Sequence, residues 1–129
     1  LAVAIGRREE ARLDVLHAYT LPSSDAAVFS GQMTEERIEE FEKQRRQAFD
    51  RFVLETDFDG VEMWRRLEVG PAHEVIVETV EQTGADLVVM GTHGRRGFER
   101  LFLGSTATRL LRRLPCPVLT VRTRRERGE

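Results

Sequence analysis

The stretch that most constrains the fold runs from Asp86 to Thr106 and reads DLVVMGTHGRRGFERLFLGST. Within it an apolar run ends at Gly91, further glycines follow, and a segment with helical apolar spacing opens at Gly104. This order predicts a strand, a glycine-rich turn and a helix start, and in open α/β sheets ligands bind where such strands end. Glycines let a ligand approach the backbone, and a helix N-terminus offers unpaired amides to an anion. The stretch therefore predicts a phosphate site.

Strands and helices alternate along the rest of the chain as well. In order, we predict a helix end over 1–5 closed by Gly6, a strand over 13–19, a long helix capped by Thr34, a strand over 61–69, a helix between Pro71 and Gly84, a strand over 85–90, a helix over 104–114 and a strand over 118–121. The helical faces that we expect to be buried are Ile38, Phe41, Ala48, Phe49, Phe52 and Val53; Ala72, Val75, Ile76, Thr79 and Val80; and Ala107, Leu110, Leu111 and Leu114. Such alternation predicts an α/β fold with a mostly parallel sheet.

Length and composition limit the possible classes of protein. The chain has 129 residues, the length of one domain, so we expect residues 1–129 to form a single domain with a charged tail over 122–129. The formal net charge of −2 predicts no general affinity for nucleic acid or for an anionic membrane. The sequence contains no run of about 18 apolar residues, so it predicts no membrane-spanning helix. The lone Cys116 excludes an internal disulfide and is compatible with a cytoplasmic location.

Several residues have both a functional and a structural interpretation. Trp64 is either a stacking platform for a base or an aromatic that covers a helix or an interface, and we favour the second. His73 and Glu74 suggest acid–base chemistry, but the sequence places no further catalytic group near them. The basic residues of the long helix lie among glutamates, which favours a solvated face over a nucleic-acid surface.

The glycine spacing differs from the two common nucleotide motifs. No Gly-Lys-Ser/Thr follows the first two glycines, so the stretch is not a Walker A sequence, and its spacing is not G-x-G-x-x-G. A longer pattern, G-2x-G-9x-G-(S/T), is matched at every fixed position by Gly91, Gly94, Gly104 and Ser105. This pattern resembles the nucleotide-binding signature of the universal stress protein family. The chain resembles that family over nearly its whole length, including the strand before the signature and the run Cys116-Pro117-Val118-Leu119-Thr120-Val121 after it.

The resemblance implies a fold and a ligand. It implies an open, mostly parallel five-stranded sheet in the order 3-2-1-4-5, flanked by helices, and ATP as the ligand of members that carry the signature. By position, it implies that the phosphates and ribose are surrounded by Gly91, Gly94, Gly104, Ser105 and Thr106, and that the nucleoside lies near Met90 and Ala18. The hydroxyls of Ser105 and Thr106 can donate to phosphate oxygens. In the loop, His93 is either a phosphate donor or a turn residue, and Arg95 and Arg96 are candidates to screen the terminal phosphate.

The sequence departs from the family in one respect. Members begin with a strand whose following turn carries an aspartate that contacts the nucleoside, and nothing here corresponds to it. That strand would lie between the second and fourth strands, so its loss would divide the sheet and expose unpaired backbone groups. We therefore expect the sequence to be incomplete at its N-terminus, with a strand swapped in from a partner as the alternative.

The sequence predicts an ATP-binding universal stress protein that acts as a nucleotide-responsive module, with AMP as a possible ligand and the need for a divalent metal left open. One alternative is a homodimeric interaction module with a vestigial pocket, dimerising through the last strand, 118–121. The other is a weak ATP hydrolase, which is disfavoured because no Walker lysine or metal-binding carboxylate is recognisable. No metal-binding residues are assigned.

Overall fold

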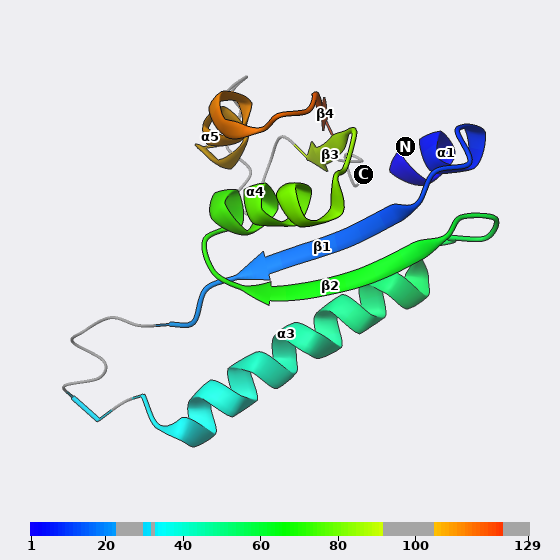
Figure 1. The fold of residues 1–129 in the computed structure, drawn as a ribbon. Coiled ribbons are helices and arrows are strands. Elements are labelled where there is room, and N and C mark those ends of the chain that lie inside the picture. The colour runs from blue at the N-terminus through cyan, green and yellow to red at the C-terminus, as the bar shows by residue number, and fades with distance from the viewer. Residues whose placement is uncertain (23–29, 32, 92–104, 123–129) are drawn as a thin grey trace, which may run out of the picture. The chain divides into compact units, whose positions relative to one another are not determined.

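The computed structural model describes residues 1–22, 30–31, 33–91 and 105–122 (Figure 1). The chain divides into two compact units, Leu1–Pro71 and Ala72–Glu129. Helices and strands alternate in the predicted order along the described residues. No helix in these ranges combines the length and apolarity needed to cross a membrane.

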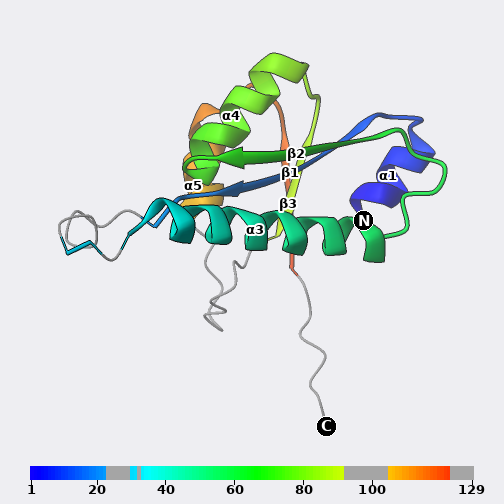
Figure 2. The same ribbon diagram turned by 90° about the horizontal axis from the view of Figure 1, so that it is seen from below.

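The first unit is built on two parallel strands and the long helix that connects them. β1 (Leu13–Tyr19) pairs with β2 (Met63–Val69) over its whole length. α3 (Glu35–Glu55) begins where predicted, because the Thr34 hydroxyl accepts a hydrogen bond from the Arg37 amide at 3.3 Å. Figures 1 and 2 both show α3 lying along the β1–β2 pair.

Where α3 meets this sheet, aromatic rings pack against one another and arginine side chains lie over two of the rings. The His17 ring lies 6.3 Å from the Phe49 ring, and the Tyr19 ring lies 6.1 Å from the Phe41 ring, measured between centroids. Two arginines lie over the same phenylalanines: the guanidinium of Arg45 is 4.7 Å from the Phe41 centroid, and that of Arg65 is 5.6 Å from the Phe49 centroid. Further along the expected face the prediction was wrong for two residues, because Ala48 is exposed and Phe52 is 55% exposed.

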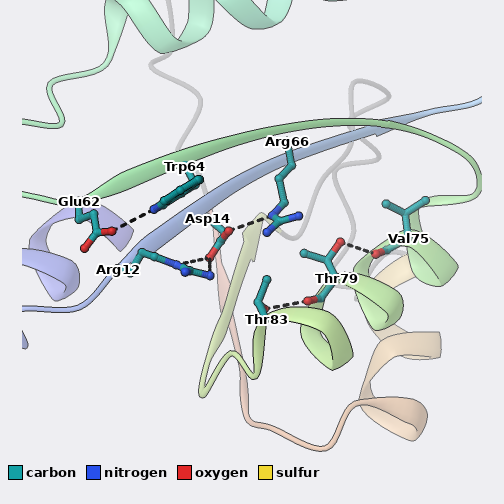
Figure 3. A network of polar contacts seen from close by, with 8 residues as sticks. All are labelled: Arg12, Asp14, Glu62, Trp64, Arg66, Val75, Thr79 and Thr83. Carbon is teal, nitrogen blue, oxygen red and sulfur yellow. Dashed lines mark hydrogen bonds and ion pairs between the residues drawn. The ribbon is translucent and has the colours of Figure 1, made fainter.

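The opposite face of β1–β2 carries a polar cluster (Figure 3). The Asp14 carboxylate accepts hydrogen bonds from Arg66 Nε at 2.9 Å and from Arg12 Nε at 3.2 Å. The Arg12 guanidinium also lies 5.6 Å from the centre of the Trp64 ring, whose indole N–H donates to Glu62 at 3.1 Å. Trp64 is thus an exposed aromatic held by local contacts, and its backbone is opposite Asp14 in the strand register.

α1 (Ala2–Arg8) corrects one expectation, because the helix continues through Gly6 instead of ending there. Gly6 is buried, and a Cβ at this position would come within 3.3 Å of a Val61 methyl group. The residue with a left-handed backbone is Glu10, at φ 50°. Gly6 therefore allows close packing and does not cap the helix.

The loop between α3 and β2 is tied to α1 by a charged pair. Arg7 donates from Nε to the Asp59 carbonyl at 2.6 Å and lies 3.4 Å from the Asp57 carboxylate. The hydrogen bond that Asp57 accepts from the Asp59 amide, aided by the Arg7 charge, lowers the pKa of the Asp57 carboxyl below its usual 3.8.

This lowered pKa gives a pH-dependent prediction. Because the folded pKa lies below the unfolded value, Asp57 contributes stability above pH 3.8, and this contribution is lost as pH falls through the folded pKa. At neutral pH, Asp57→Asn is therefore expected to unfold at a lower urea concentration than the native chain. This difference in urea midpoint should vanish under strongly acidic conditions. An NMR titration of Arg7→Gln should show a pKa for Asp57 that is less depressed but still low, because the Asp59 amide remains. A midpoint difference that does not change with pH would contradict this assignment.

The second unit repeats the pattern with shorter strands. α4 (Ala72–Thr83) ends at Gly84, whose φ of 67° supplies the predicted left-handed cap, and β3 (Val88–Gly91) follows. α5 (Ser105–Arg113) then leads to β4 (Val118–Val121), which pairs with β3 in parallel. Within α4, the hydroxyls of Thr79 and Thr83 donate to carbonyls one turn earlier, each at 2.7 Å (Figure 3), so these polar side chains are satisfied inside the helix.

The core of the second unit lies on α4 and α5, which are in contact. Its buried apolar side chains are Val75, Val77, Val80, Ala107 and Leu110. The buried face predicted for α5 was wrong at Leu111, which is 53% exposed, whereas Leu110 is fully buried as predicted. Val77 on α4 was not among the residues predicted to be buried, but it is buried next to the predicted apolar face.

The sheet differs from the single five-stranded sheet that the resemblance implied. The described strands form two separate parallel pairs, β1–β2 and β3–β4. Both pairs are neighbours in the implied order, in which they stand as 3-2 and 4-5. The neighbours that would involve the implied first strand are not found within the described ranges, so the five-stranded order stays a prediction.

Candidate functional site

The two elements that flank the glycine loop lie in the second unit. β3 ends at Gly91, which is exposed and pairs with Val121, and α5 begins at Ser105. The strand end and the helix start thus fall where the signature predicts them. The connecting residues, 92–104, lie outside the described ranges, and with them lie the predicted site residues His93, Gly94, Arg95 and Gly104.

The strand side of the candidate site is apolar. Met90, predicted to lie near the nucleoside, is half-buried and pairs with Thr120 of β4. After it, Gly91 brings no side chain to the carboxyl end of the strand. A parallel strand that ends on glycine at this edge leaves its backbone open to a ligand.

The helix side of the candidate site offers donors to an anion. The first-turn amides of an α-helix have no partner within the helix, and they carry the positive end of the helix dipole. No acidic residue stands in the first turn of α5 to compete for them, whereas Arg112 and Arg113 stand in the last turn. Thr106 lies in that first turn and is half-buried. A threonine hydroxyl can donate one hydrogen bond, so the residue type at this position suits an anionic ligand.

The remaining predicted contact, Ala18, belongs to the first unit. It is the sixth residue of β1, is half-buried, and pairs with Glu68 of β2. By strand alternation it lies on the face of the sheet that carries Asp14, opposite the face that meets α3.

The described residues do not assemble a catalytic or metal-binding group. His73 and Glu74 are neighbours at the start of α4, but His73 Nε2 lies 3.8 Å from the nearest carboxylate oxygen, beyond hydrogen-bonding range. Among the side chains that the structure describes, no three or more of His, Cys, Asp and Glu are grouped to hold a metal ion.

These features define a class: α/β proteins with parallel strands that can hold an anionic ligand at a glycine-ended strand and the start of the next helix. Within that class the chain belongs to the universal stress protein family, whose family model matches residues 1–122.

Relatives in sequence agree with this assignment. The universal stress protein Sll1388 of Synechocystis is 29% identical over 130 residues, which cover 93% of this chain and 84% of that protein. The universal stress protein A homolog 2 of Coxiella burnetii is 32% identical over 125 residues, covering 94% of this chain and 81% of that protein.

Solved structures share the fold. Hypothetical protein MJ0577 superposes with a TM-score of 0.73 at 20% identity, covering 97% of this chain and 88% of that one, and at this identity it shows the fold alone. A universal stress protein crystallised in complex with cAMP has a TM-score of 0.57 at 26% identity, covering 95% of this chain and 82% of that one.

Proposed function

We propose that this protein binds an adenine nucleotide, ATP or AMP, and acts as a nucleotide-responsive regulatory module of the stress response in the cytoplasm. The observation that carries the proposal is the complete signature formed by Gly91, Gly94, Gly104 and Ser105, with a strand end on one side and a helix start on the other. The cAMP complex of a similar protein supports an adenine nucleotide as the ligand class.

The proposed contacts divide into two groups. The glycines admit the phosphates to the backbone, while the hydroxyls of Ser105 and Thr106 and the first-turn amides of α5 donate to phosphate oxygens. His93 and Arg95 add donors from the loop, and Met90 and Ala18 contact the nucleoside. Because the proposal names no nucleophile and no general base, it is one of binding and not of turnover.

The direct test is the ligand itself. We expect mass spectrometry of material released from the purified protein to detect an adenine nucleotide, and calorimetric titration of the emptied protein with ATP or AMP to saturate. Titrations with and without Mg²⁺ will decide whether a divalent metal accompanies the ligand. The absence of a released nucleotide together with no saturable binding would refute the proposal.

We also propose a homodimer that forms through β4. This strand pairs with β3 on one edge, and within the described residues no strand pairs with its other edge. Leu119 on this strand is 37% exposed. An apolar strand with an open edge is a ready surface for pairing with its own copy.

A proline at position 120 tests the dimer through its backbone. The Pro117 carbonyl accepts from the Val88 amide on β3, so by alternation the Thr120 amide faces the other edge. Thr120→Pro should remove that donor, leave the β3–β4 pair intact, and yield a monomer by light scattering. Thr120→Val, which keeps the amide, should remain dimeric. A native chain that is monomeric at high micromolar concentration would contradict the dimer.

A further inference from the structure

One hydrogen-bonding edge of β2 is not covered by any strand that the structure describes, because β1 and β2 pair only with each other in those ranges. The Glu62 carbonyl accepts from the Leu13 amide at 2.8 Å, and the Gly70 amide donates to the Tyr19 carbonyl at 2.8 Å. Successive residues of a strand direct their backbone groups to opposite sides, so the even-numbered residues of β2 bond to β1. The amides and carbonyls that point away from β1 belong to residues 63, 65, 67 and 69.

This open edge has the features of a contact surface. Trp64 and Val69, near its two ends, are 53% and 50% exposed. The strand contains no proline, and its register with β1 is constant over its whole length, so no bulge interrupts the edge. In the order that the resemblance implies, 3-2-1-4-5, β2 is also the outermost strand. An uninterrupted edge of this kind is a template for a further strand.

The charged side chains along the edge are complementary to a second copy of themselves. Arg66 and Glu68 lie two residues apart on the face of the sheet that carries Asp14, and Glu68 is exposed. Arg66 donates from Nε to Asp14 at 2.9 Å, which holds the guanidinium beside the strand (Figure 3). A guanidinium has further N–H donors, so Arg66 can bind a second carboxylate.

We propose that β2 pairs antiparallel with β2 of a second copy of this chain, in the register centred on Leu67. A contact of one edge with its own copy has two-fold symmetry, which makes the two strands antiparallel. The outward backbone groups allow hydrogen-bonded pairs only between odd-numbered residues. The registers that then pair most of each strand are centred on Arg65, on Arg66 or on Leu67.

Charge selects among these registers. A contact centred on Arg65 or on Arg66 places that arginine opposite its own copy, and like charges directly opposite each other destabilise a strand pair. The register centred on Leu67 instead places Arg66 opposite Glu68 of the second copy and, by symmetry, does so twice. These are non-hydrogen-bonded positions, where opposed side chains approach each other most closely.

The same register gives the exposed Trp64 a position in the contact. It sets Trp64 opposite Gly70 of the second copy, and the lack of a side chain on Gly70 leaves room for the indole. On the other face, Leu67 meets its own copy, and Val69 is covered by the Arg65 of the second copy. The apolar side chains that β2 exposes at its ends are thus covered together with the free backbone groups.

The contact is tested in Thr120→Pro, which lacks the proposed β4 pairing. A contact between two strand edges is small, so we expect weak association. Thr120→Pro, a monomer at the micromolar concentrations of light scattering, should dimerise reversibly in sedimentation equilibrium as its concentration approaches about 1 mM. Trp64 is the only tryptophan of the chain, so its fluorescence emission should shift to shorter wavelength as the dimer forms.

Two charge reversals, each made in Thr120→Pro, test the register. Glu68→Arg sets arginines opposite each other, whereas Asp14→Asn/Arg66→Glu sets glutamates opposite each other without an added carboxylate clash at position 14. Each should weaken dimerisation about tenfold. An equimolar mixture of the two should dimerise as Thr120→Pro does, because opposite charges again face each other in both pairs. A purely structural role of Arg66 or Glu68 gives no such recovery.

The matched control is Glu78→Arg, which makes the same change in charge at an exposed position of α4 and should not weaken dimerisation. If circular dichroism shows that Thr120→Pro is unfolded, the native chain replaces it. The native chain should then assemble beyond the dimer, and Glu68→Arg should stop it at the dimer.

Three results would each overturn the proposal. The first is no association of Thr120→Pro at the highest concentration, which would leave the edge to a strand of another protein. The second is unchanged dimerisation of Glu68→Arg, which would place the contact in another register or on another surface. The third is a mixture of the two charge reversals that dimerises no better than its components.

Discussion

Replacing Gly104 with valine is expected to abolish nucleotide binding while leaving the fold intact. Gly104 directly precedes Ser105, where α5 begins, and the family signature requires glycine at this position. In the proposed site a branched side chain would occupy the space of a phosphate, because only glycine lets the ligand reach the backbone. Calorimetry should show a loss of affinity of more than about a hundredfold, or roughly 3 kcal/mol.

Three companion variants separate steric from electronic causes. Gly104→Ala adds a single methyl group and should weaken binding less than valine. Thr106→Val keeps the shape of the side chain but removes its hydroxyl, and the loss of one hydrogen bond to a charged group should cost about tenfold. Thr108→Val introduces the same branched residue at an exposed position one turn into α5 and should leave affinity unchanged. Native affinity in Gly104→Val would show that the nucleotide binds elsewhere.

The second large effect is expected on stability, from two adjacent leucines. Leu110 is fully buried on α5, whereas Leu111 is 53% exposed. Leu110→Ala should lower the free energy of unfolding by about 3 kcal/mol, because it removes buried surface and leaves a cavity in the core of the second unit. Leu111→Ala should change it by less than about 1 kcal/mol.

This pair is its own control. Both changes replace leucine with alanine in the same helix, so the difference in helix propensity is the same and only burial distinguishes them. Urea denaturation of the two variants measures the difference directly. Equal losses would mean that Leu111 is also buried, as it would be if the face of α5 were covered in solution by a partner or a second copy.

Much of the fold could be predicted from the sequence because the apolar spacing is local information. The strand over 13–19 and the strand over 118–121 have the predicted bounds. The start of α3 after Thr34 and the end of α4 at Gly84 were also correct, since a capping hydroxyl and a left-handed glycine are signals carried by single residues.

The errors arose where a residue's role depends on a distant partner. A glycine at position 6 is typical of a helix end, but Gly6 lies within α1. Glycine is needed there because a side chain would meet Val61, which is far along the chain. Leu111 and Phe52 fit an apolar stripe by spacing, yet neither is buried. Helical periodicity gives the direction of a stripe but not its width, which depends on how closely other elements approach.

For the candidate site, the sequence by itself determined the glycine signature, the family and the ligand class that we propose, because these depend on which residues stand at which spacing. The tertiary structure decided which strands pair, that Asp14 lies between two arginines, and that Leu110 is buried while the adjacent Leu111 is exposed. The physical reason is that spacing along a chain fixes local geometry, whereas burial and charge pairing depend on residues brought together only by folding.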